Sequence, residues 1–72
     1  MEKYNEELLE IKNKIKSYKN MLKSYPGGKN YKYVDFTIKD NDTYITAIEK
    51  NTHLVHLFYV DDIRNILVKI VD

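Results

Sequence analysis

A heptad repeat of apolar residues runs through the first third of the chain and limits its fold more than any other feature. The intervals between members alternate between four and three residues without a break, a spacing typical of an amphipathic α-helix with one buried stripe. The spacing predicts a helix from residue 2 to residue 24 within an amphipathic segment of residues 1–25. The stripe consists of Tyr4, Leu8, Ile11, Ile15, Tyr18, Leu22 and Tyr25.

A lone helix of this length has to cover its apolar stripe, and the sequence leaves three arrangements open. The stripe can pack on the rest of its own chain, or it can pair with a second copy as a homodimer or higher oligomer. Tyrosines are unusual in a strict coiled coil and frequent at protein interfaces, so a foreign protein partner is a third occupant. The predicted helix interface is Tyr4, Leu8, Ile11, Ile15, Tyr18 and Leu22.

Charge is unevenly distributed along the chain, although the formal net charge is only +1. Residues 1–10 contain four glutamates and one lysine, whereas residues 12–34 contain seven lysines and no acid. In the predicted helix, acids in the first turns and bases in the later turns both oppose the helix macrodipole.

A short linker at residues 26–30 separates two composition regimes. It contains the only proline and both glycines of the chain. A residue before proline is pushed out of the α region, so Tyr25 and Pro26 should end the helix. Gly27 and Gly28 can adopt the left-handed geometry that a helix exit often needs.

Beyond the linker the apolar period changes from helical to two, which predicts an antiparallel sheet over residues 31–72. Strands are expected at 31–39, 43–50, 54–60 and 65–71. In the first, Val34, Phe36 and Ile38 should share one face and Tyr33, Asp35, Thr37 and Lys39 the other. The third is apolar on both faces, which favours a central position. Residues 1–72 are thus expected to form one α+β domain, a long N-terminal helix followed by a β-meander that closes into a small SH3- or Sm-like barrel.

The strand region resembles the Sm/LSm family, which includes the Hfq-like RNA chaperones. The family's alternating strand, turn and following strand align without a gap on residues 34–58, and Ile63-Arg64-Asn65 aligns with its Ile-Arg-Gly motif. The resemblance implies a small barrel that binds RNA, with Arg64 beside a base. Several family residues are replaced. Asn41 stands for the turn glycine, Thr46 for the strand-bending glycine and Asn65 for the glycine after the arginine. Thr52 stands for the motif aspartate, and His56 for the base-contacting asparagine. The residues that align with the motif, replacements included, are Val34, Phe36, Ile38, Lys39, Asp40, Tyr44, Ile48, Thr52, Val55, His56 and Leu57.

Lysines interleaved with tyrosines suit binding of RNA or single-stranded DNA, because ammonium groups neutralise phosphates and aromatic rings stack on bases. Solvated lysines on a helix surface explain the same composition. Arg64 can equally form a salt bridge with Asp61 or Asp62, and His56 can be a half-buried residue with one hydrogen bond. The predicted nucleic-acid or partner surface is Lys29, Tyr31, Lys32, Tyr33, His56 and Arg64.

Catalysis and cofactor binding find little support in the residues. The chain has no cysteine, and its serines, Ser17 and Ser24, lie among lysines without an oriented base. His53 and His56 are three apart, so on a strand they point to opposite faces and cannot hold one metal ion. We therefore predict no enzyme, no metal and no cofactor. No stretch is apolar enough to cross a membrane, and the polar, acidic start does not resemble a signal peptide, which predicts a cytoplasmic protein.

Two functions remain open. In the first, the chain is a non-catalytic binding module that acts through protein–protein contacts, of the kind that a phage or mobile element uses to inhibit a host complex. In the second, it is an Sm-like binder of RNA or single-stranded nucleic acid. Replacement of the base-contacting residues favours the first.

Overall fold

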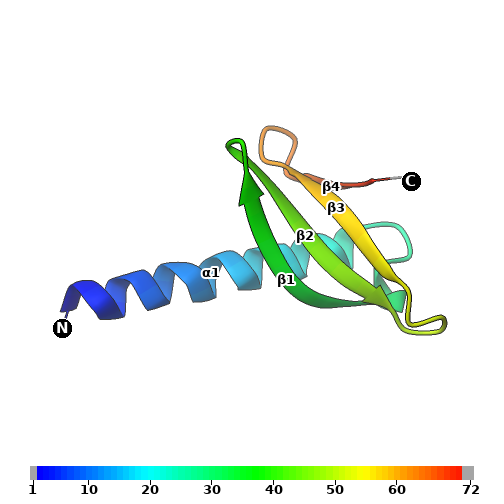
Figure 1. The fold of residues 1–72 in the computed structure, drawn as a ribbon, viewed down its shortest axis with the longest axis horizontal. Helices are drawn as coiled ribbons and strands as arrows, with labels where there is room; N and C mark the ends of the chain where they lie inside the picture. The colour runs from blue at the N-terminus through cyan, green and yellow to red at the C-terminus, as the bar shows by residue number, and fades with distance from the viewer. Residues whose placement is uncertain (1, 71–72) are drawn as a thin grey trace.

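The computed structural model describes the backbone of residues 2–70 and the side chains of residues 6–70. Helix α1 spans Glu2–Ser24, as predicted, and is followed by a single 3₁₀ turn, η1, at Gly28–Asn30. Four antiparallel strands form one sheet in the order β1-β2-β3-β4 (Figure 1). They are β1 (Tyr31–Lys39), β2 (Asp42–Glu49), β3 (Val55–Asp61) and β4 (Ile66–Lys69). The α+β class and the meander are confirmed.

The hairpin turns use residues that tolerate left-handed backbone. Asp40 and Asn41 connect β1 to β2 with φ values of 52° and 69°. Two consecutive left-handed residues are typical of a type I′ turn, whose twist matches that of a hairpin. His53 and Asn65, also at positive φ, lie in the two later turns. His53 is therefore a turn residue, as predicted.

The helix exit depends on both glycines of the linker. Gly27 adopts a φ of 78° in the left-handed region, where a β-carbon is unfavourable. Gly28 is required for a different reason. It is buried, and a β-carbon there would lie 1.8 Å from the Leu22 carbonyl oxygen. The chain thus turns back on the last helical turn so tightly that only hydrogen fits at Gly28.

One face of the sheet packs on the second half of α1 and forms the core. Tyr18, Met21 and Leu22 supply the helix side. Ile45, Ala47 and Phe58 on the central strands are fully buried, and Val60 and Leu67 complete the cluster. Each alternate residue of β2 and β3 points to the helix, as the period of two predicted.

The expected alternation of β1 is wrong in its first half. The pairing of β1 with β2 shifts between Tyr33 and Asp35, which is a β-bulge. Because the bulge inserts one extra residue, Tyr33 and Phe36 both face the core, and Val34 is left exposed. Ile38 shares the side of Phe36 but lies beyond the reach of α1, so it too is exposed.

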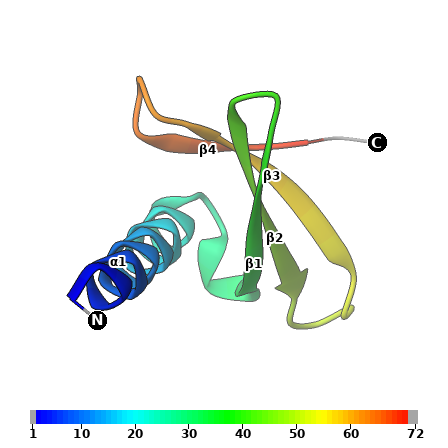
Figure 2. The same cartoon turned by 60° about the vertical axis from the view of Figure 1, so that its left-hand side comes forward.

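The sheet is open and not the predicted closed barrel. Within residues 2–70 the strand order is linear, with β1 and β4 at the two edges. Strand β3 does lie between β2 and β4, as predicted, but no element of the described residues covers its second apolar face (Figure 2).

Candidate binding surfaces

A basic groove runs between α1 and the start of β1. It encloses about 230 Å³ and is lined by Leu22 and Gly28 together with three lysines and two tyrosines. The ammonium nitrogen of Lys19 lies 5.8 Å from the centre of the Tyr33 ring, within the range of a cation–π contact. The lysines and tyrosines are Lys19, Lys23, Lys32, Tyr31 and Tyr33.

The two groove tyrosines are also structural residues. The Tyr31 ring makes edge contacts with the rings of Phe58 and His56 at centroid distances of 5.3 and 5.4 Å. The ammonium group of Lys69 donates a 3.4 Å hydrogen bond to the Tyr31 hydroxyl. The Tyr33 hydroxyl is buried and has no hydrogen-bond partner among the described residues. Burial, followed by the carboxylate of Asp35, raises the pKa of Tyr33, so this phenol stays neutral.

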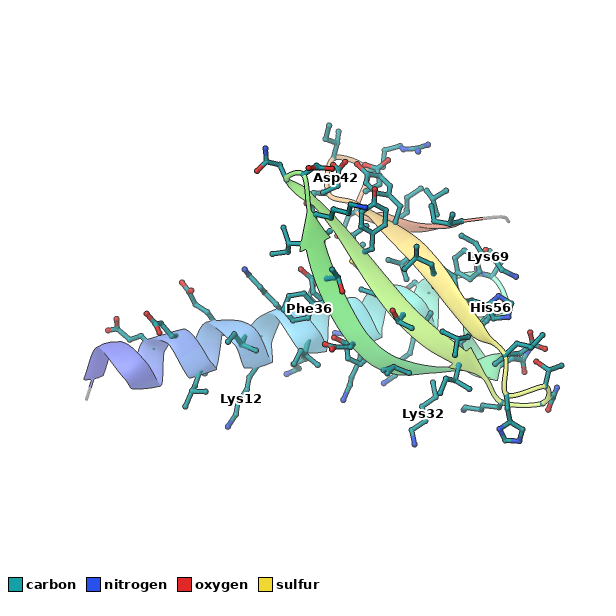
Figure 3. All side chains as sticks on the ribbon, viewed as in Figure 1. Lys12, Lys32, Phe36, Asp42, His56 and Lys69 are labelled. Atoms are coloured by element: carbon teal, nitrogen blue, oxygen red, sulfur yellow. The ribbon has the colours of Figure 1, made fainter. Side chains whose placement is uncertain are left out.

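His56 lies beside Tyr31 on the core side of β3 and is half-buried. Its Nε2 atom is 3.2 Å from a carboxylate oxygen of Glu49 on β2. The predicted half-buried histidine with one hydrogen bond is therefore confirmed. The pair lies at the end of the sheet where β1 begins, as does Lys32 (Figure 3).

Arg64 lies at the opposite end of the sheet, in the turn between β3 and β4 (Figure 1). Its Nε donates a 2.7 Å hydrogen bond to Asp61, and its backbone N–H donates one of 3.0 Å to the same carboxylate. The backbone bond, and then the guanidinium bond, lower the pKa of Asp61. The predicted salt bridge to Asp61 is confirmed, and Arg64 stands apart from the basic groove.

The six predicted surface residues thus fall into two places. Tyr31, Lys32 and Tyr33 come together in the groove, and His56 adjoins them through Tyr31. Lys29 is exposed in η1, two residues before β1. Lys19 and Lys23 of α1 also line the groove, and sequence reasoning did not single them out. Their shared helix face with Leu22 was the signal that could have found them.

On the side away from α1, strands β2 to β4 form an outer sheet face that is apolar apart from Thr46 and is exposed along β3. Sequence reasoning took the two apolar faces of β3 as a sign of a central strand. The strand is central, yet Val55 is 64% exposed and Leu57 is 43% exposed on this face. Neighbouring strands add apolar side chains in register, since Ile48 pairs with Val55 and Tyr59 pairs with both Tyr44 and Val68. The outer sheet face consists of Tyr44, Ile48, Val55, Leu57, Tyr59, Val68 and Ile70.

The outer sheet face contains a depression. It encloses about 450 Å³ and is lined by Thr37, Lys39, Tyr44, Leu57 and Ile70. The backbone N–H of Ile70 donates a 2.9 Å hydrogen bond to the Leu57 carbonyl, which holds the two aliphatic side chains next to each other. Lys39 is the one charged residue among those that line the depression.

The predicted helix interface divides into two parts. Tyr18 and Leu22 are buried against the sheet, and Ile15 is half-buried. Leu8 and Ile11 are 41% and 45% exposed, because the first turns of α1 extend past the sheet (Figure 1). The side chain of Tyr4 lies outside the described residues.

Residues 2–70 lack the features of a metal site and of a membrane-spanning helix. In this range no cluster of three His, Cys, Asp or Glu side chains could hold a metal ion. Nor does any helix of the range combine the length and the apolar character that crossing a bilayer requires.

Comparison of the chain with protein-family models, with curated proteins and with solved structures found no match. The fold that carries these surfaces is a small antiparallel four-stranded sheet packed on one helix. The surfaces themselves are the basis for the functional proposals.

Proposed function

We propose that this chain is a small non-catalytic binding module whose outer sheet face receives a protein partner. The observation that carries the proposal is a contiguous group of aliphatic and aromatic side chains on three neighbouring strands. Its aliphatic members Val55, Leu57, Val68 and Ile70 are exposed, and its tyrosines are half-buried. Single exposed apolar residues are ordinary on protein surfaces, but a contiguous apolar patch marks an interaction site. No element within residues 2–70 covers this side of the sheet (Figure 2).

The composition of the outer sheet face also fits a protein interface. Its centre holds Leu57 with the paired rings of Tyr44 and Tyr59, whose centroids are 5.7 Å apart. Tyrosine offers a large apolar area together with a polar tip, and interface centres are enriched in it. The carboxylate of Asp42, and secondarily burial, raise the pKa of Tyr59, so its phenol remains a hydrogen-bond donor at neutral pH.

The partner we propose presents an apolar protein surface with an acidic group at one side. Lys39 lines the depression beside Tyr44 and Leu57, so a carboxylate of the partner can pair with it while aliphatic groups fill the hollow. Charged residues at the edge of an interface set orientation more than affinity. Inhibition of a host complex by a phage or mobile element stays a prediction from composition.

A capture experiment with matched variants tests this function. The tagged chain should retain a protein from lysate that Leu57→Asp fails to retain, because a carboxylate in the centre of the face disrupts its apolar contact. Ile63→Asp is the matched control, since Ile63 is 97% exposed in the β3–β4 turn, outside the outer sheet face. Equal retention by Leu57→Asp, or retention of no protein at all, would contradict the proposal.

A second candidate is the Sm-like function, binding of RNA or single-stranded DNA, which the basic groove favours. Lys19, Lys23 and Lys32 line this groove together with Tyr31 and Tyr33. Affinity for a short single strand should fall steeply from low to moderate salt if these lysines displace counterions from phosphates. Lys19→Glu should weaken binding more than Lys16→Glu, which makes the same charge change on α1 outside the groove. Absence of binding at low salt would rule this candidate out.

A further inference from the structure

The first half of α1 carries an apolar stripe that its own sheet leaves open. Leu8 and Ile11 are exposed, Ile15 is half-buried, and the same stripe continues into the buried residues Tyr18 and Leu22. Residues 6–15 are called the overhang here, because this part of the helix projects from the sheet (Figure 1). We infer that the overhang pairs, in antiparallel orientation, with the overhang of a second copy of the chain.

The position of the sheet decides the orientation of the pair. The sheet already occupies the stripe at Tyr18 and Leu22. In a parallel pair, two copies aligned along one stripe would bring both sheets to the same end and the same side, where they would collide. In an antiparallel pair the sheets lie at opposite ends, and only the two overhangs meet.

The heptad spacing sets the register of the antiparallel pair. In an antiparallel pair, each a position of the heptad on one helix faces a d position on the other. Leu8 of one copy therefore lies opposite Ile11 of the other, and Ile11 of the first lies opposite Leu8 of the second. These two symmetric layers bury the two most exposed members of the stripe among the described side chains. In the same register, Glu7 flanks the stripe beside Lys14 of the second copy.

The charge distribution of α1 is self-complementary in this orientation. Glu6, Glu7 and Glu10 occupy the outer half of the overhang, and Lys12, Lys14 and Lys16 follow them. Antiparallel pairing places the acidic turns of each copy beside the basic turns of the other. Parallel pairing would place acid beside acid and would bring Lys14 next to Lys19 of the second copy. A foreign helix could fill the same stripe, but the complementarity between the two halves of α1 favours a second copy.

The mass in solution as a function of concentration tests the pairing. Light scattering or sedimentation equilibrium should show a rise from the 8.6 kDa chain mass to twice that value as the concentration approaches millimolar. Ile11→Asp should raise the dissociation constant more than tenfold and should leave the circular dichroism spectrum helical, because Ile11 is outside the core. Ile63→Asp, an equally drastic change at an exposed site off the helix, should leave the dimer unchanged. A wild-type mass of 8.6 kDa at every concentration would overturn the inference.

Charge reversal tests the orientation. Glu7→Lys and Lys14→Glu should each weaken the dimer at low salt, and the double variant should recover it. In a parallel pair Lys14→Glu would instead strengthen association, because it removes repulsion from Lys19. A dimer of Lys14→Glu tighter than the wild type would therefore refute the antiparallel arrangement. Lys16→Glu, whose side chain lies off the stripe, is the control of equal charge.

A spin label offers an independent measure of the orientation, and the absence of native cysteine makes a single site simple to label. Labels on Asn20→Cys should lie about 30 Å apart along the antiparallel pair, from the helical rise per residue. Labels within about 15 Å of each other, the separation of paired parallel helices plus linkers, would refute the arrangement. Leu57→Asp should leave the dimer intact, which separates this inference from the proposed binding of a partner on the outer sheet face.

Discussion

The rings of Tyr18 and Phe36 lie with their centroids 5.3 Å apart and their planes inclined at 55°. Tyr18 belongs to α1 and Phe36 to β1, so this contact packs the helix against an edge strand of the sheet. It also marks the point on α1 where the covered stripe gives way to the overhang.

Truncation of Tyr18 should therefore cost more stability than truncation of any overhang residue. Tyr18→Ala should lower the free energy of unfolding by about 3 kcal/mol, in the range for removal of a buried aromatic ring. Chemical denaturation at low protein concentration measures it. Leu9→Ala, at a site that is 58% exposed, should change stability by no more than about 0.5 kcal/mol. Equal losses for the two variants would show that α1 does not pack through Tyr18.

Removal of the Tyr33 hydroxyl should leave stability unchanged or raise it by about 1 kcal/mol, because a buried polar atom without a hydrogen-bond partner is unfavourable. The measurement is denaturation of Tyr33→Phe. Tyr31→Phe is the control with the opposite expectation, since its hydroxyl accepts a hydrogen bond from Lys69. A clear loss of stability in Tyr33→Phe would indicate a partner for this hydroxyl.

The same tyrosine predicts a response to alkali. The pKa of Tyr33 is raised in the folded chain, so above the ordinary value of about 10 the unfolded chain ionises first. The contribution of neutral Tyr33 to the free energy of unfolding is complete below pH about 10. It should decrease as the pH rises through that value toward the pKa of the folded chain. Thermal unfolding between pH 8 and pH 11, which brackets the ordinary tyrosine value, should show a shallower decline for Tyr33→Phe than for the wild type. Identical slopes would contradict this.

The two glycines of the linker should respond differently to alanine. Gly27→Ala places a side chain in open space but at a left-handed backbone, which should cost roughly 1–2 kcal/mol. Gly28→Ala forces a methyl group against the Leu22 carbonyl, and the cost should approach 3 kcal/mol or more. Urea denaturation of the two variants provides the comparison. A smaller loss at Gly28 than at Gly27 would argue against the close approach to the helix end.

Acidification should loosen the β3–β4 turn. Hydrogen bonds from the backbone and guanidinium of Arg64 lower the pKa of Asp61. The contribution of ionised Asp61 to the stability of the fold is therefore complete above the ordinary carboxyl pKa of about 4. It should be lost as the pH falls below that value toward the folded pKa. In Asp61→Asn this part of the acid response should disappear, as followed by melting temperature from pH 6 to pH 2, a range that spans the ordinary carboxyl value. Asp62→Asn, at the adjacent exposed residue, should respond like the wild type.

Helix, linker and strand order followed from the sequence because each depends on local pattern. The heptad of α1, the glycines after Pro26 and the left-handed turn at Asp40 and Asn41 act over a few residues. The bulge at Tyr33 could not be predicted in the same way. It depends on how β1 matches β2, and the side-chain pattern of a single strand does not reveal one extra residue in the pairing.

The candidate surfaces were less predictable than the elements. The unbroken stripe of α1 does not reveal that the sheet covers Tyr18 and Leu22 and stops short of Ile11. The two apolar faces of β3 correctly predicted a central strand, but they do not reveal that one of these faces is exposed, because an exposed interface has the same composition. Lys19 and Tyr33 meet only because the chain reverses at Gly28, so their contact spans elements that no local pattern connects.

Within residues 2–70 the open sheet leaves the outer edges of β1 and β4 without a pairing strand. The construction of these two edges bears on how the chain avoids forming fibrils. A long flat edge recruits further strands, whereas a short or kinked one discourages them. Strand β4 has only four residues, and the bulge bends the nine-residue β1 at its middle. At the bulge, the Asp35 carboxylate accepts a 2.8 Å hydrogen bond from the backbone N–H of Phe36 and places a negative charge on this edge strand. Deletion of Val34 would straighten β1, and we would expect that variant to aggregate at concentrations where the wild type stays dispersed.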